Sequence, residues 1–101
     1  MLTLGDVEAI EGGAESEEEY FASLQRAINS LEVWKFQGSY GRAMMEAITD
    51  GRCLLGREHT ADYYGNFIPS RDMVKTGTKG SLAYVKEQYG DDWAAFIEAI
   101  E

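Results

Sequence analysis

The sequence predicts a mostly helical fold, with three or four short helices around one core and an irregular or small β-hairpin insertion in the middle. Two segments, near residues 16–32 and 91–100, carry apolar residues at the spacing of an amphipathic helix. Between them, residues 52–80 hold frequent glycine and the single proline of the chain, and no helical period runs through them. A chain of 101 residues has room for one small domain, 1–101. An α+β class stays open, because the insertion could contain strands.

The first 15 residues predict a loosely held acidic arm. They contain a short apolar set and then an acidic stretch with Gly12 and Gly13. A helix is expected to begin after Ser16, because Ser16 and Glu19 have the spacing of a capping box. The helix should run to about Glu32, with an apolar stripe on one face made by Phe21, Leu24, Ile28 and Leu31.

Residues 33–36 are β-branched and aromatic apart from Lys35, which suits either a short strand or the buried end of the helix. Ser39 is a plausible cap for a second helix, which Gly51 should end because glycine tolerates the left-handed conformation there. That helix would carry Met44, Met45 and Ile48 on its apolar face.

The middle segment, residues 52–80, predicts loop and a small hairpin, with residues 53–55 and 67–68 as its apolar pieces. Ser81 should cap a third helix that Gly90 ends, and Asp91 should cap a fourth. In the fourth, an apolar stripe follows the helical period and consists of Trp93, Phe96, Ile97 and Ile100. We expect this stripe and the stripe of residues 21–31 to share one core.

Charge is distributed in three blocks. Residues 1–33 hold eight acids against Arg26, residues 34–80 hold seven bases against five acids, and residues 81–101 hold five acids against Lys86, for a net charge of −9. A field of this sign repels phosphates at long range, so direct binding to nucleic acid is not expected. Acidic residues near the start also argue against a targeting signal, and no apolar run approaches membrane-spanning length. With a single cysteine, these features predict a cytoplasmic protein without a membrane role.

Catalysis and cofactor binding find little support in the sequence. Cys53 and His59 are the only soft metal ligands, so no metal site is expected. Cys53 stands beside apolar residues, which favours a buried, inert thiol over a nucleophile, and His59 is expected to be a solvated loop residue. No cofactor motif is present. The chain is therefore expected not to be an enzyme, and a small enzyme using His59 or Cys53 ranks third among the functions considered.

Two glycine-rich basic stretches, residues 38–42 and 77–81, directly precede predicted helices, where free amides bind anions. Neither fits a phosphate loop or a dinucleotide fingerprint. Ordinary turn and capping roles are the favoured explanation for both stretches. With Arg42, Lys79 and residues 63–67, however, they support an alternative function, a module that binds a nucleotide or another phosphorylated small molecule.

The favoured function is binding of a partner protein. The acidic ends can imitate a row of phosphates for a basic surface, although acids at helix starts also serve capping and solubility. The candidate partner-binding residues are the acidic Glu15, Glu17, Glu18, Glu19, Asp91 and Asp92, and the loop residues Tyr63, Tyr64, Asn66 and Arg71. The loop residues join aromatic and cationic side chains, a combination suited to stacking and hydrogen bonding. A homo-oligomer is also compatible with the sequence.

In size, acidity and lack of cofactor motifs and targeting signals, the chain resembles the small accessory proteins of bacteriophages and mobile elements that block host defence nucleases, including anti-CRISPR and anti-restriction proteins. The resemblance is one of general character across the whole chain. It rests on no motif and transfers no functional residue. It implies that the partner is a basic nucleic-acid channel in a CRISPR or restriction nuclease complex, in the host cytoplasm, and that inhibition is stoichiometric occlusion.

Overall fold

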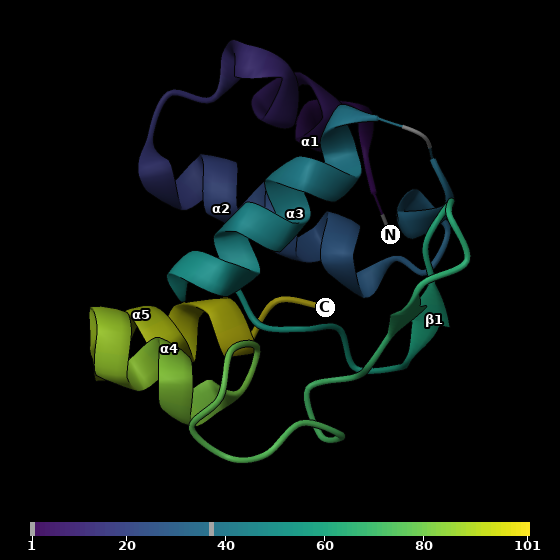
Figure 1. The fold of residues 1–101 in the computed structure, drawn as a ribbon. Helices are drawn as coiled ribbons and strands as arrows, with labels where there is room; N and C mark the ends of the chain where they lie inside the picture. The colour runs from purple at the N-terminus through teal and green to yellow at the C-terminus, as the bar shows by residue number, and fades with distance from the viewer. Residues whose placement is uncertain (1, 37) are drawn as a thin grey trace.

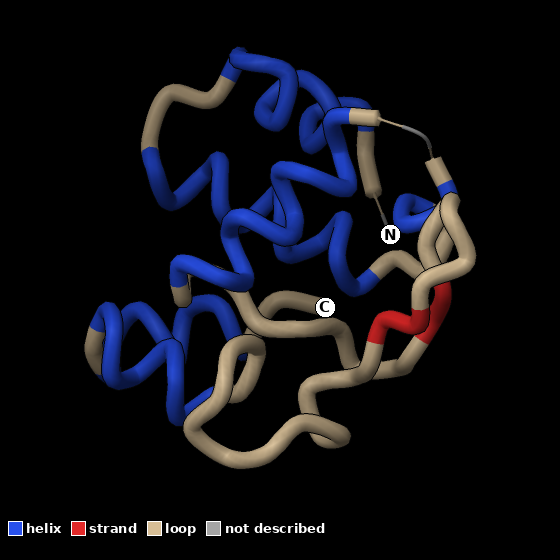
Figure 2. Tube along the Cα trace, in the orientation of Figure 1, coloured by secondary structure: helices blue, strands red, loops and turns tan. Residues whose placement is uncertain are grey.

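The computed structural model describes residues 2–36 and 38–101 and confirms the mostly helical class with a small antiparallel strand pair (Figures 1 and 2). Within these residues the α-helices are α1 (Leu4–Glu8), α2 (Glu17–Asn29), α3 (Ser39–Asp50), α4 (Leu82–Tyr89) and α5 (Asp91–Glu98). A turn of π-helix, η1 (Ala9–Gly13), extends α1, and a 3₁₀ turn, η2 (Val33–Lys35), follows α2. The strands β1 (Thr60–Ala61) and β2 (Phe67–Ile68) pair Thr60 with Ile68.

The N-terminal segment is folded onto α2, so the prediction of a loosely held arm is wrong. Thr3 and Asp6 form a capping box, in which the Thr3 hydroxyl accepts from the Asp6 amide at 3.2 Å and the Asp6 carboxylate accepts from the Thr3 amide at 3.1 Å. Asp6 is buried and also accepts from the Ser23 hydroxyl at 3.0 Å and from Arg26 Nε at 2.8 Å. An ion pair between the buried Asp6 and the half-buried Arg26 therefore docks α1, and periodicity does not reveal such a contact.

The start of α2 agrees with its sequence signal. Ser16 Oγ accepts from the Glu19 amide at 3.1 Å, as predicted. The Glu19 carboxylate accepts from the Glu15 amide at 3.0 Å, so the reciprocal contact falls one residue before the cap. The helix ends at Asn29 rather than near Glu32, and residues 33–35 form η2 rather than a strand.

Glycines set the boundaries of the later helices more often than expected. Gly38 and Gly90 occupy the N-cap positions of α3 and α5, so the predicted caps Ser39 and Asp91 are instead the first helical residues. The prediction for Gly51 is confirmed: its φ is 87°, and a Cβ there would lie 2.7 Å from Gln88 Cγ. Ser81 caps α4 as predicted, accepting from the Tyr84 amide at 3.2 Å.

Buried apolar residues form two clusters rather than one core. The larger cluster lies among α2, η2, α3 and the middle segment, and it contains Leu24, Ile28, Trp34, Met44, Ile48, Cys53, Leu55 and Ile68. The smaller cluster contains Leu54, Val85, Ala94 and Ile97 and joins α4 and α5 to the middle segment. Phe21 packs against both clusters. Phe96 is 39% exposed, so the predicted single core shared by both stripes is wrong.

The extended segment after α3 separates the two clusters. Because successive side chains of an extended chain point in opposite directions, Cys53 and Leu55 face the larger cluster and Leu54 faces the smaller one. The Leu55 amide donates to the Gly80 carbonyl at 3.1 Å. At Gly80, φ is 92° and a Cβ would lie 2.5 Å from Leu55 Cδ1. The middle segment is therefore part of the interior as well as a surface loop.

Figure 2 shows the two short strands within a long non-helical stretch that borders the helical part of the molecule. The Tyr63 amide, in the turn between the strands, donates to the Trp34 carbonyl at 2.9 Å, which fastens this turn to η2. Among the residues described, no helix has the length and apolar character needed to cross a membrane.

Candidate functional site

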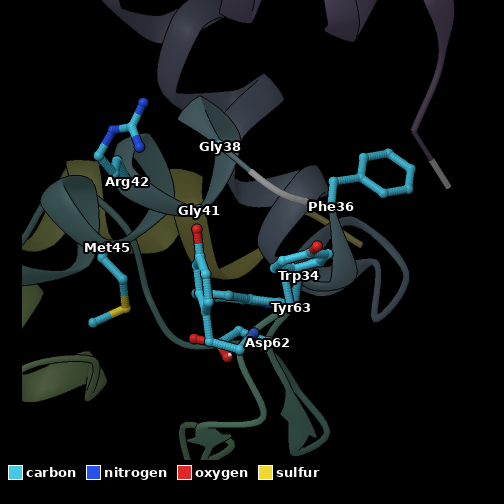
Figure 3. A pocket seen from close by; sticks show the side chains of 9 residues that line it. Trp34, Phe36, Gly38, Gly41, Arg42, Met45, Asp62 and Tyr63 are labelled. Atoms are coloured by element: carbon cyan, nitrogen blue, oxygen red, sulfur yellow. Dashed lines mark hydrogen bonds between the residues drawn. The ribbon is translucent and has the colours of Figure 1, made fainter.

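A pocket of about 230 Å³ opens where η2, the first half of α3 and the turn between the strands meet (Figure 3). Arg42 and Met45 of α3 lie on one side in Figure 3 and Phe36 lies on the other, with Trp34, Asp62 and Tyr63 between them. Its lining consists of Trp34, Phe36, Gly38, Gly41, Arg42, Met45, Asp62, Tyr63 and Tyr64, and we call it the aromatic pocket.

Hydrogen bonds hold the parts of the aromatic pocket in place. Trp34 is buried, and its Nε1 donates to the Ile28 carbonyl at 3.1 Å, which fixes the indole ring. Asp62 orders the turn, since one carboxylate oxygen accepts from the amides of Tyr64 and Asn66, each at 2.9 Å. Desolvation acts to raise the pKa of Asp62, but these hydrogen bonds outweigh it and hold the pKa below its ordinary value. The pocket is thus built before any ligand arrives.

The side chains around the pocket are unusually exposed for their type. Phe36 is 53% exposed, Met45 43%, Tyr63 51% and Tyr64 69%. The rings of Tyr63 and Tyr64 meet edge to face at 5.0 Å between centroids. Single exposed apolar residues are ordinary on protein surfaces, but a group gathered around one hollow is typical of a binding site.

Arg42 is the cationic residue in the lining of the pocket. It is exposed and makes no ion pair with the residues that the structure describes. Lys35, on η2, donates from Nζ to the Ala61 carbonyl at 3.3 Å. The lining of the pocket therefore carries one charge of each sign, Arg42 and Asp62.

Four candidate residues come from the middle loop. Tyr63 and Tyr64 line the aromatic pocket, and Asn66 lies in the same turn, where its Nδ2 donates to Asp62 at 3.2 Å. Arg71 does not line the pocket: its Nε donates to the Leu55 carbonyl at 2.9 Å. Desolvation, assisted by the nearby charge of Arg57, lowers the pKa of Arg71 below its ordinary value. Arg71 therefore supports the interior segment rather than an aromatic and cationic surface.

The acidic candidates lie at two helix starts, outside the aromatic pocket. Glu18 of α2 is exposed, as are Asp91 and Asp92 at the start of α5. Glu17 is not a free charge, because its carboxylate lies 3.0 Å from Arg52 Nη1. Glu15 and Glu19 are also exposed, although Glu19 contacts the Glu15 amide.

The remaining candidates are placed clearly. Cys53 is buried, as predicted, and burial raises the pKa of its thiol far above the ordinary value despite the nearby charge of Arg52. His59 is exposed and lies beside the Phe67 ring. Across residues 2–36 and 38–101, no three His, Cys, Asp or Glu side chains come together in a way that could hold a metal ion.

The two glycine-rich stretches differ in their surroundings. In the stretch at residues 77–81, the Gly77 amide donates to Ser81 Oγ at 3.0 Å and the Ser81 amide donates to the Thr78 carbonyl at 3.0 Å. These amides serve a turn, and they do not present a cradle for an anion. The stretch at residues 38–42, in contrast, contributes Gly38, Gly41 and Arg42 to the aromatic pocket.

Sequence reasoning missed three major parts of the pocket: Trp34, Phe36 and Met45. The sequence predicts Met44 and Met45 on one apolar helix face, but Met44 is buried and Met45 is exposed. A usable signal was the spacing along α3, because Met44, Ala47 and Ile48 complete its buried face and leave Met45 outside it.

No protein-family model, curated protein sequence or solved structure matches this chain.

Proposed function

We propose that this chain is a small acidic interaction protein whose partner inserts one large side chain into the aromatic pocket. The observation that carries the proposal is the exposure of Phe36, Met45 and two tyrosines around a hollow floored by Trp34. Tyrosine, tryptophan, phenylalanine and methionine are enriched at protein interfaces, and anchors that fill preformed pockets carry much of the binding energy.

The size of the pocket favours a side chain over a whole metabolite. Pockets for drug-sized ligands span about 300–1,000 Å³, and this one measures about 230 Å³. One aromatic or long aliphatic side chain fills such a volume. Because Trp34 and Asp62 are already held by hydrogen bonds, little ordering is needed when the anchor enters.

The net charge supports a basic partner. A molecule of charge −9 attracts a positively charged surface and speeds the encounter, while the pocket supplies contacts at short range. We propose occlusion of that surface as the mode of action. The resemblance in general character to anti-CRISPR and anti-restriction proteins makes a basic nucleic-acid channel of a nuclease complex the first partner to test.

The test compares capture by the wild type with capture by Tyr64→Ala, followed by binding measurements with each purified candidate. Phe67→Ala is the matched control, because Phe67 is exposed on β2 and does not line the pocket. We expect Tyr64→Ala to weaken binding about tenfold or more, as anchor-pocket residues do, and Phe67→Ala to leave it unchanged. A partner that binds all three proteins equally would contradict the proposal.

One observation favours a second candidate function, binding of a nucleotide or another phosphorylated small molecule. Gly38, Gly41 and Arg42 meet the two tyrosines in one pocket, and a base could stack there with its phosphate near Arg42. Thermal-shift measurements with mononucleotides and cyclic nucleotides distinguish the two functions. A rise in melting temperature that Arg42→Ala abolishes would support nucleotide binding. If no nucleotide raises the melting temperature, binding of a protein partner is favoured.

A further inference from the structure

A groove between α2 and α3 has a different chemistry from the aromatic pocket. Its floor contains Tyr20, Phe21, Ala43 and Ala47, and the carboxylates of Glu46 and Asp50 stand at its edge. We call it the α2–α3 groove. Its volume is about 340 Å³, enough for a long side chain together with part of its backbone.

The charged residues that line this groove are both acidic, Glu46 and Asp50, and of the two Asp50 lies near a cation, Arg52, at 3.8 Å. A neighbouring cavity of about 470 Å³ shares Tyr20 and Phe21 with the groove and is lined by Glu15 and Glu17. Neither cavity has a lysine or arginine among the lining residues that the structure describes. Glu46 is exposed, and it forms no ion pair within that same part of the chain. An apolar floor with carboxylates above it is complementary to a cation that has an aliphatic stem.

The protein already holds one guanidinium, that of Arg52, against the ring of Phe21, which also lines the groove. Arg52 Cζ lies 5.0 Å from the Phe21 ring centroid, and it also lies 4.0 Å from the Tyr89 ring centroid and 5.3 Å from that of Trp93. Its Nη1 lies 3.0 Å from Glu17 and its Nε 3.8 Å from Asp50. This internal arrangement combines stacking with carboxylate pairing, the two interactions that favour arginine over lysine.

We infer that the α2–α3 groove binds an arginine side chain presented by the basic partner. The stem of that arginine covers Ala43 and Ala47, its guanidinium approaches Tyr20, and Glu46 supplies the counter-charge. The inference rests on the proposed function, since it specifies what the partner presents beside the anchor that fills the aromatic pocket. Met45 lines that pocket and Glu46 the groove, so neighbouring residues of α3 serve both contacts.

The experiment uses a defined probe, the blocked tripeptide acetyl-Gly-Arg-Gly-amide, in a titration followed by amide chemical shifts of the full chain. A version of the peptide with lysine tests whether the planar guanidinium is needed. A version with citrulline tests whether the positive charge is needed. We expect shifts concentrated at Tyr20, Phe21, Ala43, Glu46 and Ala47, weaker binding of the lysine peptide, and no saturable binding of the citrulline peptide.

Glu46→Gln should weaken binding of the arginine probe about twofold to fivefold, the size expected for one exposed charge pair. Glu87→Gln is the matched control, because Glu87 is an exposed carboxylate on α4 outside the groove, and it should bind like the wild type. Equal affinities of the two variants, or shifts spread over all acidic surfaces, would overturn the inference. Concentration-dependent self-association that blocks the probe would also overturn it, because a second copy would then be the occupant.

The two proposals can fail separately. If Tyr64→Ala weakens partner binding but Glu46→Gln binds the arginine probe as tightly as the wild type, the groove inference fails alone. If the probe selects the groove but no partner depends on the aromatic pocket, the proposed function fails while the arginine site stands.

Discussion

At the scale of single residues, Gln25 connects the first amphipathic helix to the interior. Its side chain is fully buried, with Oε1 accepting from the Leu54 amide at 2.8 Å and Nε2 donating to the Leu54 carbonyl at 3.1 Å. Nε2 also donates to Asn29 Oδ1 at 3.0 Å. The amide group thus replaces the strand partner that the extended segment lacks, which explains a polar residue at a buried helix position.

Replacing Gln25 with methionine should destabilise the fold by about 2–4 kcal/mol, because the amide and carbonyl of Leu54 lose their partners while the volume is kept. Urea unfolding followed by circular dichroism measures the change. The matched control is Gln88→Met, on the exposed side of α4, which should stay within about 0.5 kcal/mol of the wild type. Similar losses for both variants would show that Gln25 does not hold the segment.

Cys53 is the second residue with a direct test. Its side chain is buried, its Sγ lies 3.5 Å from the Phe21 carbonyl, and burial raises the pKa of the thiol, so the reactive thiolate is disfavoured. A disulfide reagent such as Ellman's should label Cys53 slowly in the native protein and rapidly in denaturant. Rapid labelling of the native chain would contradict the burial of Cys53.

At the scale of elements, α1 and α5 are held by different forces. The buried carboxylate of Asp6 docks α1 through Ser23 and Arg26 of α2. Apolar burial holds α5, in which Ile97 is fully buried. The stabilisation from the Asp6 contact should therefore depend on pH, whereas the stabilisation from α5 should depend on the volume of its buried side chains.

The contribution of Asp6 should disappear in acid. Burial acts to raise its pKa, but the hydrogen bonds from Arg26, the Thr3 amide and Ser23 outweigh burial and lower the pKa from 3.8 to about 2. Because the folded state favours the charged form, the stabilisation is present above the ordinary pKa and lost as the pH falls towards 2. From the size of the shift it amounts to about 2 kcal/mol.

Unfolding free energies between pH 6 and pH 2, compared for the wild type and Asp6→Asn, check this prediction. The difference in unfolding free energy between the two proteins should be largest near neutral pH and should disappear in acid. Glu8→Gln, which removes an exposed carboxylate from the same helix, is the control and should show no such converging gap. A gap that is constant with pH would mean that packing, rather than charge, docks α1.

For α5, alanine substitutions at neighbouring positions should have unequal effects. Ile97 lies in the smaller cluster, so Ile97→Ala should cost about 2–4 kcal/mol. Phe96→Ala should cost about 1 kcal/mol, because its ring is partly exposed and contacts Trp93 at the surface of the cluster. Thermal unfolding compares the two variants, and a larger loss at Phe96 would contradict the assignment of the buried face.

At the scale of the whole molecule, charge governs encounters with a partner. The described part of the chain has a radius of gyration of 12.4 Å, so charges at its ends lie within a few Debye lengths of one another at physiological salt. Association with a basic partner should therefore slow as salt rises. Such steering acts on the association rate, whereas the aromatic pocket should determine dissociation.

Reversing Glu15 and Glu18 to lysine should slow association and make its salt dependence shallower, with little change in melting temperature, because both side chains are exposed. Glu17 needs separate treatment, since its reversal would also break the ion pair with Arg52 and lower stability. Stopped-flow or surface plasmon resonance measurements at several salt concentrations test the prediction. Binding that is indifferent to salt and to both reversals would refute electrostatic steering.

The helical class, the start of α2, the end of α3 at Gly51 and the buried position of Cys53 are determined by the sequence itself. In each case the cause is local: an apolar period, a hydroxyl cap, or a backbone angle that suits glycine. The pattern of aromatic residues beside cations in the middle loop predicts Tyr63 and Tyr64 as partner-binding residues; both line the aromatic pocket, and their binding of a partner stays a prediction.

The remaining features depend on contacts between segments distant in the sequence, which no local pattern encodes. Asp6 is buried because Ser23 and Arg26 come to meet it, and Leu54 faces a second cluster because Gln25 binds its backbone. The aromatic pocket forms only where η2, α3 and the strand turn converge, and the α2–α3 groove forms only where two helices pack. Periodicity reports which face of one helix is apolar, but only the packing of the whole chain decides which surface stays uncovered.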